Sequence, residues 1–476
     1  DIAPDGTPVV VPGPPFFGDT PDNHVNEVFV LGGGPQSLTT LPGSEGPLIG
    51  DEVDGEAITW AVPDDTGDRI FGFAEDGRHL TTVDPRTGVV LTTFGYDADG
   101  WLTSRTDAHG NTVTIQRDTD GVPTGIVDAY GRLTTVAVTD GMITGITDPA
   151  GRTRTFGYDD GLLVEQVDAA GGTSTYTYDT LGRLTGAVAA DGQVTTLTET
   201  TVREDDESGH EVTMTVGVDG GGDATTYRTV TRGSRIVHTI TDPTGAITEV
   251  ETSADGSTVE TSVPSGLSRS VSYGPHPQLG GLVLVETERR TSSSASGGFT
   301  FSSTETEWEA TLADPLDPLS LETMTARVTN PDGTTTTRTF DATTMTETLT
   351  HDDGRVETRT FDALGRVTSH IEAAGATPTT YAHDARGRLV RVARGAHEEV
   401  HTYDDSGRLR TTTNGEGETV SWIFDDADRL VSWTSPEGRT TTYSWDDRDH
   451  RNGWGLPGTD AHELTLTPFG LLDSHT

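Results

Sequence analysis

The eight residues YDTLGRLT at 178–185 return, almost unchanged, as FDALGRVT at 361–368. Related copies are YDDSGRLR at 403–410 and the degenerate FDDADRLV at 424–431. An aromatic residue followed by Asp marks each copy, and the Asp residues of neighbouring copies are 20 to 22 residues apart. This near-constant period predicts a repeat architecture. The pairs are Tyr96-Asp97, Tyr158-Asp159, Tyr178-Asp179, Phe340-Asp341, Phe361-Asp362, Tyr403-Asp404, Phe424-Asp425 and Trp445-Asp446, with His383-Asp384 in the same register.

Each repeat contains alternating sequence that predicts a strand, followed by a turn. In GGTSTYTYD (171–179), Tyr176 and Tyr178 share one face while Thr175 and Thr177 take the other, which is the two-residue period of a strand. The Asp of each pair can accept backbone N–H bonds in a turn, and a Gly three positions later tolerates a positive φ. The glycines at this position are Gly100, Gly121, Gly182, Gly365, Gly387 and Gly407.

A second turn occurs in each repeat, as in DPAG (148–151) and SPEG (435–438). One repeat is therefore expected to be strand, tight turn, strand, tight turn, with strands of roughly seven residues that span about 23 Å. Stacked edge to edge, such units form a continuous antiparallel ribbon whose aromatic side chains line up in ladders. Because strand twist accumulates, we expect the ribbon to coil into a hollow spiral. The expected aromatic ladder comprises Tyr96, Tyr158, Tyr178, Phe361, Tyr403, Phe424 and Trp445.

Composition favours the same all-β class and limits the partners. Apolar residues make up only 32% of the 476 residues, with 58 Gly and 24 Pro, as in proteins with many short strands and turns. The net charge of -45 repels nucleic acid and anionic membrane surfaces. No apolar run reaches the ~18 residues that a membrane-spanning helix needs. The absence of Cys excludes disulfides and Cys-ligated metals. We therefore expect neither nucleic-acid binding nor membrane insertion.

The units resemble the YD repeats of the RHS family, which includes bacterial RHS proteins, toxin complex C components and the extracellular domains of teneurins. The stretch LTTFGYDADGWLTSRTDAHGNTVTIQRD (91–118) is similar to the start of the repeat region in many bacterial members. The resemblance is clear over residues 68–200 and 331–450, and implies a hollow YD shell that encloses a C-terminal effector in the toxins. A DPxGxxDGxNxYxY-type motif, which closes the shell and carries self-cleavage aspartates in the family, is not found. Self-cleavage is therefore not expected of this chain.

Five sections are expected along the chain. Within the third of them, YGPHPQLGG (273–281) and TSSSASGG (291–298) are predicted to be exposed, protease-accessible bends. The sections are a Pro/Gly-rich lead-in or plug at 1–55, a YD-repeat block at 56–200, a Thr-rich irregular β section of the same shell at 201–335, a second YD-repeat block at 336–450, and the interrupted start of a following section at 451–476.

One stretch, GAHEEVHTYD (395–404), contains an HExxH pattern from His397 to His401. On a helix this pattern can hold zinc, with its glutamate as general base. The Tyr403-Asp404 pair, however, places the pattern in the strand slot of a repeat. Strand residues four apart lie about 13 Å from each other, which is too far for two ligands of one zinc ion. We therefore expect no zinc site and no catalytic residues here.

Asp-rich turns such as DADG (97–100) and DTDG (118–121) raise the alternative of bound Ca²⁺. Neither turn continues into a full calcium-binding loop with a terminal Glu, so capping of the turn by Asp is the preferred interpretation. We expect no cofactor, and Ca²⁺ stays open as the alternative.

An Arg follows the turn glycine in several repeats, where its guanidinium could bridge to the Asp of an adjacent unit. The alternative is a solvated rim of Arg side chains. A structural ladder predicts that Arg183→Ala or Arg366→Ala lowers the thermal midpoint. The Gly-Arg pairs are Gly182-Arg183, Gly365-Arg366, Gly387-Arg388 and Gly407-Arg408.

The expected function is that of a non-catalytic shell segment in a secreted or cell-surface protein, hence an extracellular one. Its expected partner is a polypeptide: a cargo, or the remainder of a longer chain with an effector beyond Thr476. The alternative is an extracellular adhesion or glycan-binding module, in contact with glycans or neighbouring cells, or a fibre or scaffold component. In that alternative, exposed tryptophans would stack on sugars, namely Trp422, Trp433, Trp445 and Trp454.

Overall fold

The computed structural model describes residues 52–53, 55–204, 207–218, 221–293, 300–315, 317–458, 461–466 and 472–475. Regular secondary structure in these residues consists of β-strands. A short pair, β1 (Glu52–Val53) and β2 (Glu56–Ala57), precedes the main sheet. From β3 onward every strand pairs antiparallel with the next one along the chain, as far as β39. The predicted all-β ribbon is confirmed, and the predicted lead-in at 1–55 lies almost wholly outside the described residues.

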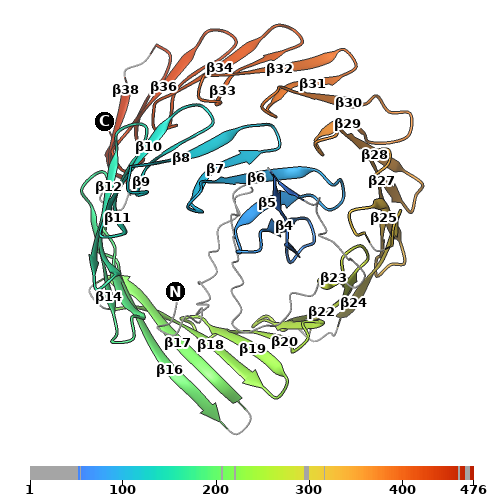
Figure 1. Ribbon diagram of the computed structural model, residues 1–476, viewed down its shortest axis with the longest axis horizontal. Coiled ribbons are helices and arrows are strands. Elements are labelled where there is room, and N and C mark those ends of the chain that lie inside the picture. The colour runs from blue at the N-terminus through green and yellow to red at the C-terminus, as the bar shows by residue number, and fades with distance from the viewer. Residues whose placement is uncertain are drawn as a thin grey trace.

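The first part of the ribbon spirals outward from near its own axis (Figure 1). Its strands are short because a turn interrupts the alternating sequence after five to seven residues in most cases. They are β3 (Trp60–Pro63), β4 (Ile70–Phe73), β5 (His79–Val83), β6 (Val90–Tyr96), β7 (Leu102–Asp107), β8 (Thr112–Arg117), β9 (Pro123–Val127), β10 (Leu133–Thr139), β11 (Met142–Thr147), β12 (Thr153–Asp159), β13 (Leu162–Val167), β14 (Thr173–Tyr178) and β15 (Leu184–Val188).

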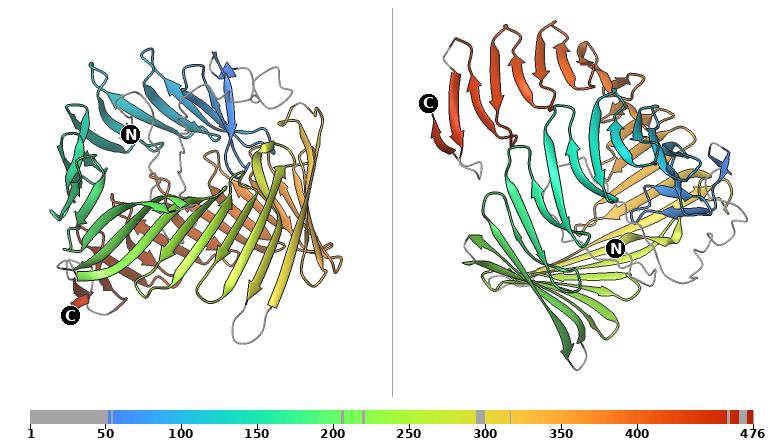
Figure 2. Two further views of the ribbon diagram at one scale, coloured as in Figure 1. Left: turned by 90° about the horizontal axis from the view of Figure 1, so that it is seen from below. Right: turned by 60° about the vertical axis from the view of Figure 1, so that its left-hand side comes forward.

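The middle of the ribbon contains much longer strands. Five of them have 11 to 14 residues. A twelve-residue strand is about 40 Å long and a six-residue strand about 20 Å, so one long strand spans the height of two stacked short ones (Figure 2). The strands are β16 (Val194–Glu204), β17 (Glu207–Val218), β18 (Gly221–Arg232), β19 (Arg235–Thr241), β20 (Ile247–Ser253), β21 (Thr258–Ser262), β22 (Leu267–His276), β23 (Gly280–Ser293), β24 (Thr300–Leu312) and β25 (Leu321–Thr329).

The last part of the ribbon returns to short strands and completes the turn of the spiral, so that it stacks on the first part (Figures 1 and 2). Its strands are β26 (Thr335–Asp341), β27 (Thr346–His351), β28 (Val356–Phe361), β29 (Val367–Ile371), β30 (Thr379–His383), β31 (Leu389–Arg394), β32 (His397–Tyr403), β33 (Leu409–Asn414), β34 (Thr419–Phe424), β35 (Leu430–Thr434), β36 (Thr440–Trp445), β37 (Arg451–Gly455), β38 (Ala461–Leu466) and β39 (Leu472–His475).

The main apolar cluster lies at the start of the spiral. Ile70, Leu80 and Val83 of β4 and β5 pack there against Leu279 and Val283, which come from the turn between β22 and β23 and from β23 itself. These five side chains are at most 2% exposed. The start of the ribbon thus packs against a part of the same sheet that lies about 200 residues later in the sequence. Such a contact is typical of a coiled sheet that must bury one of its faces.

The turn between β22 and β23 was predicted to be an exposed bend. This prediction is wrong for His276, Gln278 and Leu279, which are buried, whereas Gly280 and Gly281 are exposed. Gln278 is only 5% exposed. Its side-chain amide donates to the carbonyls of Pro85, at 2.7 Å, and Pro318, at 2.6 Å. Nδ1 of His276 accepts the backbone N–H bonds of Gln278 and Leu279. The polar sequence PHPQLGG resembles a surface loop, but the amide nitrogen of Gln278 and Nδ1 of His276 make their hydrogen bonds inside the protein. Most of the other predicted bend, residues 294–298, lies outside the described residues.

Candidate functional site

The turn after most of the aromatic-Asp pairs is held by the Asp carboxylate. In the turn that starts at Asp404, Oδ1 accepts the backbone N–H bonds of Ser406 and Arg408, and Oδ2 accepts a bond from the Arg408 guanidinium at 2.8 Å. Partial burial raises the pKa of Asp404, but these hydrogen bonds outweigh it, so the pKa lies below the usual value. The same three bonds occur in the turns that begin at Asp128, Asp148, Asp179, Asp362, Asp384 and Asp425.

The predicted Gly-Arg pairs therefore act first within their own turn. Arg183 binds Asp179 of its own turn, and it also binds Glu199 at 2.6 Å. Arg366 and Arg388 bind the Asp of their own turns, Asp362 and Asp384. The prediction that Arg bridges to the Asp of a neighbouring unit applies to Arg408, which also donates to Asp428 at 2.9 Å. The six predicted turn glycines all have a positive φ, between 75° and 83°.

A β-bulge precedes nearly every one of these turns. The strand register shifts next to the aromatic residue of the pair, and such a bulge bends the strand and increases its local twist. The shift occurs at Tyr96, Tyr158, Tyr178, Phe361, His383, Tyr403, Phe424 and Trp445.

The aromatic residues tie successive strands together through their polar ends. The hydroxyl of Tyr403 donates to the carbonyl of Leu389 at 2.6 Å, and Nε1 of Trp445 donates to the carbonyl of Leu430 at 2.8 Å. Tyr96, Tyr158 and Tyr178 make the equivalent bond to His79, Ile143 and Leu163. In these repeats, the residues of the predicted aromatic ladder thus form a row of hydrogen bonds to backbone carbonyls.

The tryptophans proposed for sugar stacking are partly buried rather than exposed. Trp422 lies opposite Trp433 on the neighbouring strand, and Tyr443 lies opposite Trp454. The indole of Trp454 stacks on His462 with the ring centroids 5.2 Å apart. Neighbouring side chains cover much of each ring, because cross-strand pairs on one face of a sheet pack against each other.

The HExxH pattern lies on β32, as predicted from its register. His397 pairs with Arg394 across the hairpin, and Nδ1 of His401 hydrogen-bonds with Thr412 Oγ1 at 3.0 Å. Across the residues that the structure describes, no group of three His, Asp or Glu side chains has a geometry that could hold a metal ion. Oδ1 of Asp97 and Oδ1 of Asp118 accept backbone N–H bonds from their own turns. Turn capping thus accounts for these two side chains.

The contacts that are most distant in sequence form a seam between two stacked coils of the ribbon. We call residues 84–192 the first coil and residues 362–450 the second coil. Arg132 and Arg152 of the first coil make ion pairs with Asp428 and Asp449 of the second. Both Arg residues also bind the Asp of their own turn. In the first coil, the turns at the seam are those that begin at Asp128 and Asp148, which do not follow an aromatic-Asp pair. In the second coil, they are the turns that follow the pairs Phe424-Asp425 and Trp445-Asp446.

At another point of the seam the Arg belongs to the second coil, and its partners belong to the first coil. Arg386 donates to the carbonyl of Ala129 at 3.0 Å, and its guanidinium carbon lies 4.8 Å from the ring centre of Tyr130. Asn111 donates to the carbonyl of Arg386 at 3.1 Å. Main-chain, ionic and cation–π contacts therefore all contribute to the seam.

Sequence reasoning missed Asp428 and Asp449, the two acceptors at the seam. Both residues occupy the fourth position of their turn, where other repeats have Gly, and both adopt a positive φ, 63° and 64°. A non-Gly residue in this conformation is uncommon, and Asp is one of the types that tolerate it. The sequence does contain a signal, because FDDADRLV has Asp428 at the position where YDTLGRLT, FDALGRVT and YDDSGRLR have Gly.

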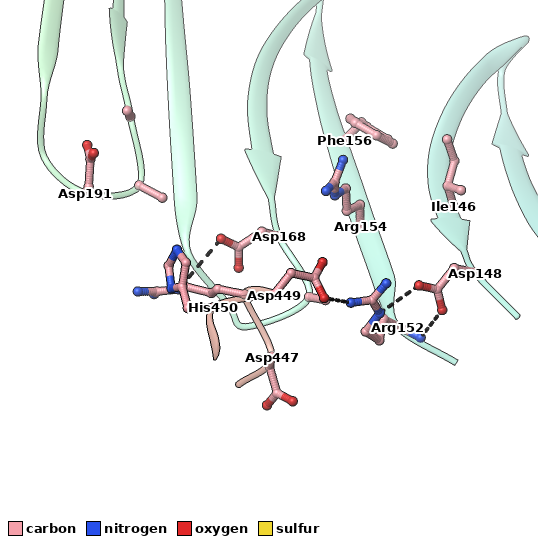
Figure 3. Close-up of a pocket in the computed structure, with 14 residues that line it drawn as sticks. Ile146, Asp148, Arg152, Arg154, Phe156, Asp168, Asp191, Asp447, Asp449 and His450 are labelled. Atoms are coloured by element: carbon pink, nitrogen blue, oxygen red, sulfur yellow. Dashed lines mark hydrogen bonds and ion pairs between the residues drawn. The ribbon is translucent and has the colours of Figure 1, made fainter. Parts of the chain in front are cut away.

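The seam opens into a hollow of about 580 Å³ beyond Asp449. In Figure 3, Asp449 and His450 of the second coil lie beside Arg152 and Asp168 of the first coil, whereas the carboxylate of Asp447 points away from them. At the far end of the hollow, the turns of the first coil contribute Asp168, Ala169, Ala189, Ala190 and Asp191. The mixture of charges and the internal Arg–Asp pairs make the hollow part of the seam and not a separate binding site.

None of the described residues belongs to a helix of the length and apolarity that crossing a bilayer requires. The geometry as a whole is that of a curved wall: one ribbon, capped turns at its edges and a seam between successive coils. Neither the hollow at the seam nor a second one lined by residues of β20 to β24 brings a nucleophile, a base and oxyanion-binding groups together.

Comparison with known proteins finds a matching family model and several similar proteins. A sequence model of the family described as Teneurin YD-shell matches residues 58–472. Teneurin-4 of Mus musculus and Teneurin-4 of Homo sapiens are each 36% identical to this chain over 69 residues, which are 14% of the chain and 2% of the relative. A Photorhabdus luminescens Tc holotoxin pore has a TM-score of 0.43 at 13% identity, over 86% of this chain and 23% of that one. A TcdB2-TccC3 structure without its hypervariable C-terminal region has a TM-score of 0.41 at 15% identity, over 84% of this chain and 24% of that one. The chain thus spans a small part of each relative.

Proposed function

Because the chain belongs to the teneurin YD-shell family, we propose that it forms part of the wall of a hollow protein shell and performs no catalysis itself. The observation that supports this proposal most directly is the seam. A single curved sheet leaves a gap between its coils, and an enclosing wall has to close that gap. Arg132 and Arg152 close it here with ion pairs to Asp428 and Asp449.

The proposed partner is a polypeptide, either a cargo or the remainder of a longer chain that the shell encloses or supports. The proposed location is extracellular or at the cell surface. A net charge of -45 suits a wall that keeps itself soluble and does not attract nucleic acid. The Thr side chains that hydrogen-bond across neighbouring strands, such as Thr402 with Thr411 and Thr413 with Thr419, give the sheet a polar face.

Protease protection tests the enclosing role. A protease-sensitive passenger polypeptide would be fused after Thr476, and its rate of cleavage compared with that of the free passenger. Enclosure predicts much slower cleavage of the fused passenger, and faster cleavage once Arg132→Ala and Arg152→Ala weaken the seam. Equal cleavage of fused and free passenger would contradict enclosure and leave a supporting scaffold as the function.

A second candidate, adhesion through glycans, is favoured by the aromatic row on β34 to β38. Trp422 and Trp433 face each other, as do Tyr443 and Trp454, and Thr441 connects the two pairs on the same face. Aromatic rings in a row can stack on sugar rings. Retention of the chain on a glycan array, lost in Trp433→Ala and Trp454→Ala, would support this candidate, and no retention would exclude it.

A further inference from the structure

We infer that the two coils recognise each other in one register, through side chains of matched size and charge along the seam. This inference goes beyond the proposed function, because it does not depend on what the shell encloses. The repeats are so alike that the second coil could, in principle, stack on the first after a shift of one repeat. The contacts across the seam differ from turn to turn, and these differences select one arrangement.

The size match involves two aromatic rings of the first coil and two glycines of the second. A β-carbon added to Gly407 would overlap the ring of Tyr130, and one added to Gly387 would overlap the ring of His109. Both rings come from the third position of their turn, in DAYG (128–131) and DAHG (107–110). An aromatic ring at this position of the first coil therefore requires Gly at the facing position of the second.

The charge match involves the next two repeats. There the third position of the first-coil turns is small, with Ala150 and Ala170, and the second coil has Asp in place of Gly. Those aspartates, Asp428 and Asp449, receive the guanidinium groups of Arg132 and Arg152. The Arg residues occupy the fifth position of their turns. The equivalent position in the preceding first-coil turn is the uncharged Asn111.

A shift by one repeat in either direction breaks these matches. In one direction Tyr130 would meet Asp428 instead of Gly407, so a ring and a carboxylate would compete for the same space. In the other direction Arg132 would meet Gly407 and lose its carboxylate partner. Close packing makes the first error costly. In the second, Arg132 keeps Asp128 of its own turn but loses the two hydrogen bonds to Asp428, and Asp428 loses its partner from the first coil. The seam is thus a recognition surface whose partner is one defined row of turns in the same chain.

A comparison of two glycine substitutions tests this inference. Gly407→Ala and Gly182→Ala place the same β-carbon at nearly the same φ, 83° and 78°, in the same kind of turn. Gly182 meets only Leu162, at 3.8 Å, and does not face a second coil. The difference between the two thermal midpoints therefore isolates the contact with Tyr130 from the backbone strain. We expect Gly407→Ala to lower the midpoint clearly more than Gly182→Ala.

A rescue experiment completes the test. In the Gly407→Ala background, Tyr130→Ala removes the ring that the new methyl group meets, so the double variant should regain part of the lost midpoint. If Gly407→Ala yields no folded protein, recovery of folded protein in the double variant supports the inference. Equal midpoints for the two glycine variants, or a further loss on adding Tyr130→Ala, would overturn it.

Discussion

Arg132 donates to both carboxylate oxygens of Asp428, at 2.7 and 2.8 Å, although 296 residues separate the two along the chain. The same Arg also binds Asp128 of its own turn at 2.7 Å. One guanidinium therefore stabilises a local turn and joins two coils of the spiral. The planar fork of Arg suits this double role, since it can donate to two carboxylates at once.

The first prediction separates these two roles. Arg132→Ala removes the contacts to Asp128 and Asp428, whereas Arg366→Ala removes the guanidinium contact to Asp362 of its own turn. The two Arg side chains are similarly exposed, at 27% and 24%. We expect both variants to lower the free energy of unfolding, and Arg132→Ala to lower it by about 1 kcal/mol more, the size of a well-formed, partly exposed ion pair. Chemical denaturation measures the difference. Equal losses would show that the seam pair contributes nothing.

The second prediction concerns the positive φ of Asp428. Asp428→Gly relieves a backbone conformation that Gly adopts freely, but it also removes the ion pairs with Arg132 and Arg408. Asp140 has a similar φ of 52° and lies in the first coil, so Asp140→Gly is the matched control. In the control, Gly stabilises the folded state by relieving backbone strain and destabilises it by making the unfolded chain more flexible. These two effects nearly cancel, within roughly 1 kcal/mol. Asp428→Gly should therefore be about 1 kcal/mol less stable than the control. The idea fails if Asp428→Gly is the more stable of the two by the same measurement.

The local structure of this protein was predictable from the sequence, and the stacking of its coils was not. The Tyr-Asp period, the alternation in GGTSTYTYD and the turn glycines determine strands, turns and even the strand position of His397 and His401, because these are interactions between near neighbours. Which turns meet across the seam depends on the curvature of the ribbon. That curvature is a small twist per strand summed over many strands, so a slight error per strand misplaces Arg132 by a whole repeat. The buried turn at Gln278 escaped prediction for a similar reason, since its partners Pro85 and Pro318 are distant in sequence.

The third prediction concerns the hydrogen bonds of the aromatic ladder. Tyr178→Phe keeps the ring but removes the hydroxyl that donates to Leu163 at 2.7 Å. Tyr176 lies on the same strand, β14, and its hydroxyl makes no hydrogen bond within the described residues, so Tyr176→Phe is the control. We expect Tyr178→Phe to cost about 1 kcal/mol, the net contribution of one hydrogen bond, and Tyr176→Phe to cost less. Thermal and chemical denaturation measure both variants. Indistinguishable stabilities would argue that the rings act by packing alone.

The fourth prediction concerns the HExxH pattern. His397 and His401 lie on one strand, about 13 Å apart, and His401 already hydrogen-bonds with Thr412. Added zinc should therefore leave the thermal midpoint unchanged, both in the natural chain and in His397→Ala/His401→Ala. Isothermal titration calorimetry provides a direct check. Tight one-to-one binding that disappears in the double variant would contradict the strand interpretation.

The last prediction is a pH dependence that arises from His276. Burial lowers the pKa of this imidazole, and the charge of Asp68 opposes the shift only partly. Its Nδ1 must stay unprotonated to accept the N–H bonds of Gln278 and Leu279. The unfolded chain therefore binds a proton at a higher pH than the folded chain, so stability is fully present above about pH 6.5 and falls as the pH drops from there toward the folded-state pKa.

Replacement of His276 checks this pH dependence. Thermal midpoints measured from pH 7.5 down to pH 5 should fall for the natural chain, and His276→Asn should flatten part of that fall. The remainder belongs in part to His383, whose pKa is also lowered, by burial and by the nearby positive charge of Arg366. The carboxylates that cap the turns, such as Asp404, have lowered pKa values and lose their contribution only at lower pH. A slope identical in the natural chain and in His276→Asn would show that the turn at Gln278 does not sense pH through this residue.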